Sequence, residues 1–309
     1  MAQHMEHANQ ASVAIITRTK NRIILLERCI RTVLAQTSED WCHVIVNDGG
    51  DAYELESLVE KFSDAYAGRL KVIHNEKSVG MEAASNIGIC QSKSRYLIIL
   101  DDDDTWAPSF LQEMVKALQA ETWENTRGII CHTEIVYEKF EGDKVVETGR
   151  TDFNAWLKRV SLLQLFAWNR FTPVCFLFER SVLDEIGMFS EELPVIGDWE
   201  FNIRFLSNYE IAVYPEYLAF WHQRPEVKSG YGNSVHKDND LHEKYRVLLT
   251  NRWLREAIKK GTMDFGQLYA ASIVLENQHL QQLRYDRIIR GLRKFFLFSL
   301  WRKIRDIFR

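Results

Sequence analysis

The chain has 309 residues, of which 46% are hydrophobic and 27% charged, which is typical of a folded protein with one large domain and an appendage, or with two domains. Its net charge of −4 at pH 7 argues against nucleic acid as the partner of the whole chain. The five cysteines are widely spaced without a C-x-x-C pair, and no apolar run reaches about 18 residues, so neither a zinc site, a disulfide framework nor a transmembrane helix is predicted.

Residues 1–11 are polar, and we expect them to form a flexible leader. Up to about residue 108, apolar runs of strand length alternate with segments of helical periodicity. Strands are predicted at 13–17, 42–46, 70–74 and 96–100, and helices at 23–35, at 53–66 and from residue 80 onward. This alternation predicts an α/β fold with a doubly wound, mostly parallel sheet that carries helices on both faces.

Polar residues follow three of these predicted strands, around Thr17, at Asp48 and at 101–104. The carboxyl ends of parallel strands meet at one edge of a sheet, where ligands bind. Residues 101–104 are four consecutive aspartates, which repel one another unless a cation, hydroxyl groups or backbone donors compensate them. Hard oxygen ligands of this kind suit Mg2+ or Mn2+. A solvated acidic turn before the helix near Pro108 is the alternative, but the buried strand at 96–100 favours a ligand site.

The pattern after residue 108 is less regular. We predict a helix at 110–120, strand at 128–137, a hairpin turn at 141–144, strand at 171–178, an edge strand at 217–221 and mostly helix after residue 240. The apolar and aromatic stretch 156–168 is predicted to be a core helix. The glycine-rich stretch 230–235 predicts either a mobile lid or a linker.

Four segments in this order resemble a family 2 glycosyltransferase with the GT-A fold over about residues 12–225: Thr17–Arg22, Val46–Asp51, Gly80–Gly88 and Leu100–Pro108. The resemblance implies a catalytic domain with a nucleotide-sugar half at about 12–108 and an acceptor half at about 109–225. The stretch 156–168 would then face the acceptor, as the alternative to a core helix. Residues 226–309 would form a lid or linker and a helical extension.

The resemblance also implies which residues hold the donor. Thr17 and Asp48 are expected to hold the base and the ribose of a nucleotide-diphosphate sugar. Further donor contacts are expected from Arg18, Asn21, Asn86, Asp101 and Asp102. Ser85 stands where the family often has arginine, so the basic contact expected there must come from elsewhere in this chain.

The D-x-D motif of the family corresponds to residues 101–103. The resemblance implies that Asp103 is the main ligand of Mn2+ or Mg2+, with Asp101 and His222 as further ligands. His222 follows the predicted edge strand, and His236 is an alternative candidate for this position.

The stretch Gly197–Arg204 is similar to the family's Glu-Asp-x-Asp-Leu-x-x-Arg, and Asp198 matches the general base. An acceptor hydroxyl is a poor nucleophile, and inversion is a single in-line displacement, so a carboxylate must take the hydroxyl proton as the bond forms. Gly197 replaces the first acidic residue of the pair, which leaves Asp198 alone in this role. Asp198 as a helix N-cap is the alternative, and it is compatible with catalysis.

The implied activity is an inverting sugar transfer to a hydroxyl group of a glycan or lipid-linked acceptor, in bacterial surface polysaccharide or lipopolysaccharide synthesis. A nucleotidyltransferase of related fold would need a glycine-rich basic loop after the first strand, and residues 18–22 contain no glycine. P-loop and dinucleotide fingerprints are also absent. A non-catalytic nucleotide- or carbohydrate-binding scaffold would be favoured by loss of Asp103 or Asp198, and both are present.

Residues 284–309 carry a net charge of +7, which predicts a basic tail with its own partner. Apolar residues recur there at three- and four-residue steps with Phe and Trp among them, as in helices that lie in a membrane interface. We therefore expect a cytoplasmic enzyme that binds the anionic inner face of the plasma membrane through this tail. The alternative is a helix that packs on the catalytic domain or on a second subunit of a homodimer.

Overall fold

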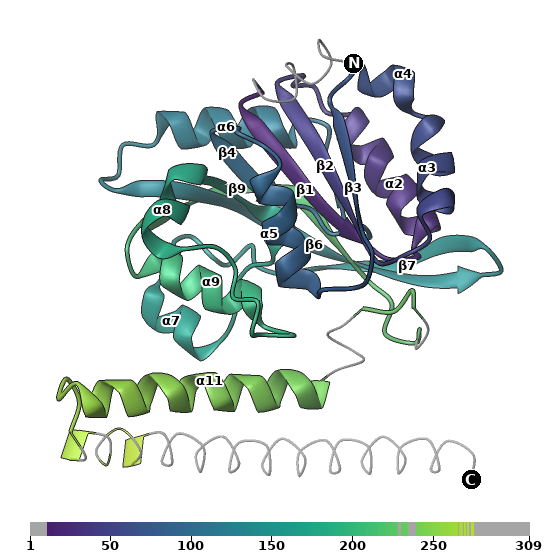
Figure 1. Cartoon of the computed structure of the whole chain (residues 1–309). Coiled ribbons are helices and arrows are strands. Elements are labelled where there is room, and N and C mark those ends of the chain that lie inside the picture. Colours follow the sequence, from purple (N-terminus) through teal and green to yellow (C-terminus); the bar gives the residue numbers. More distant parts are fainter. Residues whose placement is uncertain are drawn as a thin grey trace, which may run out of the picture. The chain divides into compact units, whose positions relative to one another are not determined.

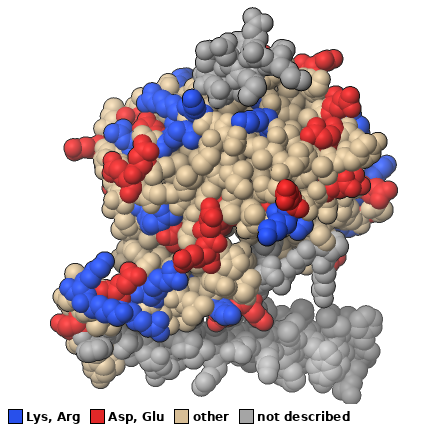
Figure 2. All heavy atoms as spheres, in the orientation of Figure 1, with Lys and Arg blue, Asp and Glu red and all other residues tan. Residues whose placement is uncertain are grey.

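The computed structural model describes residues 11–227, 230–233 and 239–264, together with residues 266, 267, 269, 271, 273 and 274. Contacts along the chain divide it into two compact units, Met1–Tyr245 and Arg246–Arg309. The larger unit contains every strand of the described residues and the cavity described below. On the face drawn in Figure 2, the Lys and Arg side chains of this unit are interspersed with Asp and Glu.

The larger unit is built on a nine-stranded sheet in the order β3-β2-β1-β4-β8-β6-β9-β5, with β7 paired to β6 outside this path (Figure 1). The first four strands run parallel and are β1 (Val13–Thr19), β2 (Trp41–Asp48), β3 (Leu70–Asn75) and β4 (Tyr96–Ile99). Because β2 and β3 lie on one side of β1 and β4 on the other, the strand order reverses between β1 and β4. Such a reversal opens a crevice at the carboxyl ends of the strands. The predicted α/β fold with a doubly wound, mostly parallel sheet is therefore confirmed.

Four helices connect these strands: α2 (Ile23–Leu34), α3 (Ala52–Glu60), α4 (Ser63–Tyr66) and α5 (Met81–Cys90). The predicted helix at 53–66 is interrupted between α3 and α4. Helix α5 lies very close to the sheet, because a Cβ at Gly88 would be 2.5 Å from Cγ2 of Ile16 in β1. This close approach brings the start of α5 to the carboxyl ends of β1 and β2.

The second half of the sheet is mixed. Its strands are β5 (Thr105–Trp106), β6 (Thr126–Glu141), β7 (Lys144–Asp152), β8 (Phe176–Glu179) and β9 (Glu210–Gln223), and α6 (Phe110–Ala120) follows β5. The prediction that 217–221 form an edge strand is wrong, because β9 lies between β6 and β5. The predicted strand at 171–178 is shortened to β8, because a 3-10 helix, η1 (Pro173–Cys175), occupies part of it.

The remaining helices of this half are α7 (Leu162–Ala167), η2 (Arg180–Val182), α8 (Leu183–Ile186) and α9 (Gly197–Leu206). Aromatic rings attach α9 to β8: the centroids of Phe178 and Phe201 are 5.3 Å apart, and those of Phe176 and Phe205 are 5.1 Å apart. Helix α7 is linked to α9 because Nε1 of Trp199 donates a hydrogen bond to the Leu165 carbonyl oxygen (2.7 Å). These contacts position the first turn of α9.

The aromatic stretch 156–168 is not the predicted core helix. Only α7 is helical there, and the side chains of Trp156 and Trp168 are 53% and 61% exposed. Leu157, Val160 and Leu165 are buried and attach the segment to the domain. The segment thus places large aromatic side chains on the surface.

Helix α11 (Asn239–Lys259) contains the boundary between the two units. Among the described residues, no helix is long and apolar enough to cross a membrane. The predicted basic tail at 284–309 and His236 lie outside the described residues.

Candidate active site

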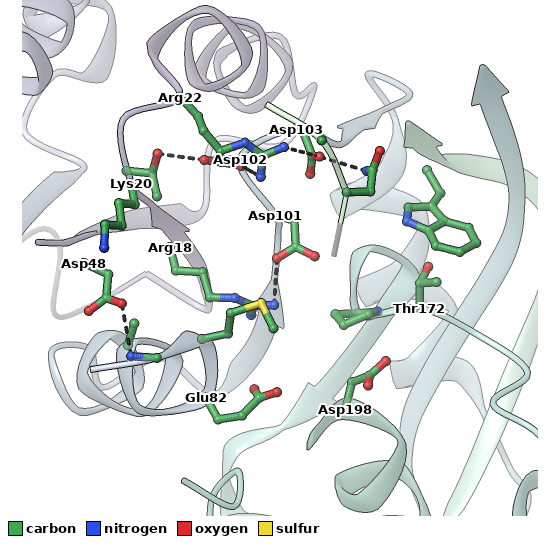
Figure 3. A pocket seen from close by; sticks show the side chains of 18 of the residues that line it. Arg18, Lys20, Arg22, Asp48, Glu82, Asp101, Asp102, Asp103, Thr172 and Asp198 are labelled. Atoms are coloured by element: carbon green, nitrogen blue, oxygen red, sulfur yellow. Dashed lines mark hydrogen bonds and ion pairs between the residues drawn. The ribbon is translucent and has the colours of Figure 1, made fainter. Parts of the chain in front are cut away.

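A cavity lies where the strand order reverses, at the carboxyl ends of β1 and β4 (Figure 3). Its walls come from the end of β1 and the loop after it, the loop after β4, and the first turns of α5 and α9. The Lys, Arg, Asp and Glu side chains that line it are Arg18, Lys20, Arg22, Asp48, Glu82, Asp101, Asp102, Asp103 and Asp198. Residues from five different segments of the chain therefore meet around one space.

The aspartates after β4 are paired with arginines from the end of β1 and the loop after it. Arg18 Nη2 lies 2.9 Å from Asp101 Oδ1, and Arg22 Nη1 lies 2.8 Å from Asp102 Oδ1. Arg22 also reaches Asp103, with 2.6 Å between Nη2 and Oδ2 (Figure 3). The repulsion expected within the acidic run is thus offset by guanidinium groups of the same protein.

Behind this wall lies a second ionic group that contains Arg224, whose side chain is 0% exposed. Its Nη2 contacts Asp103 Oδ2, and its Nη1 donates to Glu138 Oε2 (2.8 Å). Glu138 also contacts Arg28 and accepts a hydrogen bond from His222 Nδ1 (2.6 Å). The acidic run and β6 are therefore joined through buried arginines.

The carboxyl groups of this region differ in pKa. Burial would raise the pKa of Asp103, but Arg22 and Arg224 outweigh it and hold this pKa at about 2. Burial raises the pKa of Asp102 to about 6 although Arg22 opposes the change. For Glu138, burial is outweighed by the hydrogen bond from His222 and by nearby charges, so its pKa is about 2. Two guanidinium groups outweigh burial at Asp103, and His222 with Arg28 outweighs burial at Glu138, whereas burial outweighs Arg22 at Asp102.

The three residues predicted to bind a metal are not arranged as a metal site. The ring nitrogens of His222 are engaged by Glu138 Oε1 (2.6 Å) and by Thr105 Oγ1 (2.7 Å). Oδ2 of Asp103 already accepts from Arg22, Arg224 and Asn233. Within the described part of the chain, no group of three or more His, Cys, Asp or Glu side chains is arranged to hold a metal ion. The predicted set of Asp103, Asp101 and His222 therefore does not fit Mn2+ or Mg2+ in this structure.

Asp48 lines the opposite wall of the cavity, at the end of β2. Its Oδ1 accepts from Asn75 Nδ2 and from the Val79 backbone N–H, both at 2.9 Å. Its Oδ2 accepts from Ser78 Oγ (2.6 Å) and from the Gly80 N–H (3.1 Å). Burial opposes ionisation, but these donors lower the pKa of Asp48. The carboxylate holds the loop before α5 in place at the cavity edge.

Four predicted site residues do not line the cavity. Thr17 is 0% exposed, and its Oγ1 lies 2.9 Å from His43 Nε2 inside the core. Asn21 Oδ1 accepts from the Asp51 N–H (2.7 Å). Asn86 exchanges hydrogen bonds with the backbone of Phe189 (2.9 and 3.1 Å). Together with His222, these residues stabilise the walls of the cavity rather than face its interior.

The cavity is also lined by four residues of the matched segments that were not predicted as site residues, namely Thr19, Lys20, Arg22 and Glu82. The signal that could have found Arg22 and Lys20 was the basic composition of residues 18–22. A basic group does lie beside Ser85, because Arg18 Nη1 donates to Ser85 Oγ (2.8 Å). Arg18 therefore stands between Ser85 and Asp101.

Asp198 is the second residue of α9, and its Oδ2 accepts a hydrogen bond from Asn169 Nδ2 (2.8 Å). Asn169 is itself contacted by Asn202 Nδ2 (3.3 Å), one turn further along α9. The N-cap of α9 is Ile196, so Asp198 is not the cap residue. Burial raises the pKa of Asp198, and the charge of Asp101 adds to this effect, while the Trp199 N–H and the charge of Arg18 oppose it. A carboxylate of raised basicity therefore faces the cavity.

A second carboxyl group, Glu82, occupies the space that Gly197 leaves beside Asp198. A Cβ built on Gly197 would lie 2.3 Å from Glu82 Oε1. Glu82 is 6% exposed, and burial raises its pKa to about 7 although Arg18 opposes the change. The acidic residue that the sequence lacks at position 197 is thus replaced in space by one from α5.

Comparison with known proteins identifies relatives of the chain. The family model described as Glycosyl transferase family 2 matches residues 14–187, which is more than half of the chain. The chain is 34% identical over 205 residues to WcaA of Escherichia coli (strain K12), a glycosyl transferase named for colanic acid biosynthesis, covering 65% of this chain and 68% of the relative. It is 25% identical over 204 residues to YwdF of Bacillus subtilis (strain 168), named as an uncharacterized glycosyltransferase, covering 66% and 71%.

Two solved structures share the fold. S. aureus TarS 1-349 in complex with UDP has a TM-score of 0.56 at 18% identity, covering 70% of this chain and 61% of that chain. The mannosyltransferase PcManGT from Pyrobaculum calidifontis, in complex with GDP-Man and Mn2+, has a TM-score of 0.53 at 15% identity, covering 86% and 80%. The family model matches more than half of the chain, and the chain belongs to glycosyl transferase family 2.

Proposed function

We propose that this protein transfers a sugar from a nucleoside-diphosphate sugar to a hydroxyl group of a glycan or lipid-linked acceptor, with inversion at the transferred carbon. The observation that carries the proposal is the division of the cavity. Three basic side chains, Arg18, Lys20 and Arg22, line one part of it, and Asp198 lies across from Lys20 and Arg22 (Figure 3). Leaving group and proton acceptor thus have separate places.

The basic part of the cavity suits a diphosphate. Guanidinium groups match phosphate oxygens in geometry and remain charged at neutral pH. Arg18 and Arg22 are themselves held in place by Asp101, Asp102 and Asp103, which keeps their positions defined. Two solved structures that share the fold are named in complex with UDP and with GDP-Man, which supports a nucleotide-sugar donor without choosing between the two nucleotides.

The other part suits the acceptor. As the acceptor oxygen forms its bond to the anomeric carbon, the bond from that carbon to the diphosphate oxygen breaks, and its electron pair leaves with the nucleoside diphosphate. The hydroxyl proton passes to a carboxylate oxygen of Asp198, which Asn169 orients through the hydrogen bond to Oδ2. Attack from the side opposite the leaving group produces inversion.

The experiment is a donor screen with UDP- and GDP-sugars, followed by release of nucleoside diphosphate and by proton NMR of the product anomer. Asp198→Asn should leave donor affinity within about a few fold and reduce turnover by roughly 100-fold or more, the scale of general-base loss. Asp184→Asn, an exposed aspartate in the first turn of α8, is the matched control and should match wild type. Retained anomeric configuration, or unchanged turnover of Asp198→Asn, would refute the proposed chemistry.

We also propose that the acceptor is part of a surface polysaccharide or glycolipid and that the protein works at the cytoplasmic face of the plasma membrane. Relatives named for colanic acid and for PGL/p-HBAD biosynthesis support the acceptor class. The net charge of +7 in residues 284–309 supports binding to anionic lipid, at about 1 kcal/mol for each Lys or Arg near the surface. Co-sedimentation with anionic liposomes should be lost when the chain ends at Leu283, and equal binding of both forms would contradict a docking role for the tail.

A further inference from the structure

Four arginines pair with four carboxylates around the acidic run, and these pairs take up the positions in which a cation was expected. The pairs are Arg18 with Asp101, Arg22 with Asp102 and Asp103, Arg28 with Glu138, and Arg224 with Asp103 and Glu138. We propose that Arg22 and Arg224 take the place of a divalent metal ion at Asp103, and that the enzyme transfers sugar without a metal. The inference rests on the glycosyl transfer proposed above.

Arg224 is an integral part of the fold. Its side chain is 0% exposed, its Nε donates to the Tyr231 carbonyl oxygen (2.9 Å), and its backbone N–H donates to Asn233 Oδ1 (2.8 Å). Asn233 Nδ2 in turn contacts Asp103 Oδ2 (3.1 Å) and the His222 carbonyl oxygen (2.8 Å). Displacing this guanidinium would remove one of the two arginine partners from each of two buried carboxylates, Asp103 and Glu138, which is unfavourable.

A metal ion bound at Asp103 would also meet like charge. Two guanidinium groups contact the same Asp103 oxygen, and Coulomb repulsion between cations is strong in a buried environment. Both oxygens of Asp102 are occupied as well, by Arg22 Nη1 (2.8 Å) and by Thr19 Oγ1 (2.7 Å). His222 cannot add a ligand while its two ring nitrogens contact Glu138 and Thr105.

The arginines can supply the charge that the reaction needs. When the bond to the diphosphate breaks, negative charge accumulates on the leaving oxygen, and preorganised cations near it lower the barrier. Arg22 and Lys20 line the cavity, while Arg224 lies behind Asp103 and holds the carboxylate that orients Arg22. Arg22 is therefore assigned to the diphosphate, and Arg224 is a positioning residue.

The first test uses the full wild-type chain and needs no variant. UDP and GDP are each titrated by calorimetry in chelator and in Mn2+. For each nucleotide, the dissociation constants in the two solutions should agree within about twofold, because the cations that bind the diphosphate are side chains. Transfer rates in the two solutions should agree equally well. A tenfold or greater loss of affinity or of rate in chelator, restored by Mn2+, would overturn the inference.

The two proposals fail in different ways. A protein that transfers no sugar but binds UDP or GDP equally with and without metal would contradict the proposed transfer and support the binding role of the arginines. A protein that transfers only with Mn2+ would confirm the transfer and overturn the role of the arginines.

The second test uses variants. Arg22→Ala should weaken nucleoside-diphosphate binding and transfer by about tenfold or more, and added guanidinium should restore part of the transfer while Mn2+ should not. Arg31→Ala, an exposed arginine on α2, is the matched control. Transfer by Arg22→Ala within about twofold of wild type would overturn the assignment. Arg224→Lys keeps the charge but loses the planar set of N–H donors, so it should lower the transfer rate without changing its dependence on metal. A folded Arg224→Lys that transfers sugar only with Mn2+ would show that this position tolerates a metal ion.

Discussion

The cavity has two clusters of acidic side chains, one beside β4 and one beside α9, and their carboxyl groups differ in pKa. On the side of β4, Asp103 is buried against Arg22 and Arg224, and its pKa of about 2 keeps it ionised. On the side of α9, Glu82 shares Arg18 with Asp101 and Asp198, and burial raises its pKa to about 7. The comparison teaches that the supply of guanidinium groups, rather than burial alone, separates carboxylates that organise charge from carboxylates that can exchange a proton.

The largest expected effect comes from removing the most tightly paired carboxylate. Asp103→Ala leaves the fully buried Arg224 without one of its two carboxylates, so the free energy of unfolding should fall by about 3–5 kcal/mol. Urea unfolding of this variant and of Asp184→Ala, which removes an exposed carboxylate, measures the difference. Equal stability of the two variants would show that the ionic group at Asp103 does not exist in solution.

Beside α9, the ionisation of Glu82 should make the fold less stable as the pH rises. The pKa of Glu82 is raised in the folded state, so the native protein holds a proton that the unfolded chain has released between about pH 4.5 and 7. Glu82 therefore lowers stability as pH rises through this window, by at most about 3 kcal/mol. Arg18 favours ionisation, while Asp198, Asp101 and Glu200 oppose it.

Glu82→Gln should remove this loss, so its melting temperature should exceed that of wild type at pH 8 more than at pH 5. Thermal unfolding from pH 5 to 8 measures both curves. Parallel curves for the two proteins would contradict the raised pKa of Glu82.

A smaller effect is expected where α5 and α9 meet. Gly197→Ala places a Cβ against Glu82 Oε1, and overpacking of this kind costs about 1–3 kcal/mol. Glu82→Ala removes the obstructing carboxyl group, so the double variant should recover stability relative to Gly197→Ala. Additive effects in this double-mutant cycle would show that the two side chains do not compete for one space.

The smallest effect is expected from the amide that orients Asp198. Asn169→Ala removes one hydrogen bond to Oδ2, a contribution of about 1 kcal/mol, so turnover should fall several fold while the affinity for UDP stays unchanged. Because Asn169 also stabilises the charged carboxylate, the pH at which turnover reaches half of its maximum should rise. A lower turnover without any change in the pH profile would assign Asn169 a structural role only.

The parallel half of the sheet was predictable because three of its four strands, β1, β2 and β4, are largely buried apolar runs. Residues 13–16 and 96–99 are buried throughout, and their pattern shows this without knowledge of the fold. The placement of β9 was not predictable, because its partner β5 has only two residues and produces no periodic signal. The prediction of a core helix at 156–168 was wrong for a related reason, since composition alone does not distinguish a core helix from a surface segment.

The acidic run and Asp198 could be predicted from motifs, but their partners could not. Arg224 follows Asp103 by 121 positions, and Glu82 reaches Gly197 from a different helix. Pairs of this kind depend on how α5, α9 and β9 pack, and no local pattern carries them. The sequence therefore indicated the carboxylates but not which of them pair with arginines, and for this reason a metal was expected at Asp103.

The most direct test of the contrast between the two sides is carbon NMR of the carboxyl groups in protein labelled at Asp and Glu, with Asp103→Asn and Glu82→Gln used for assignment. The predicted result is a Glu82 carboxyl carbon that titrates near pH 7 and an Asp103 carbon that stays ionised throughout the pH range in which the protein is folded. Titration of Glu82 near its ordinary pKa of about 4.3, or protonation of Asp103 in the folded protein, would contradict the account.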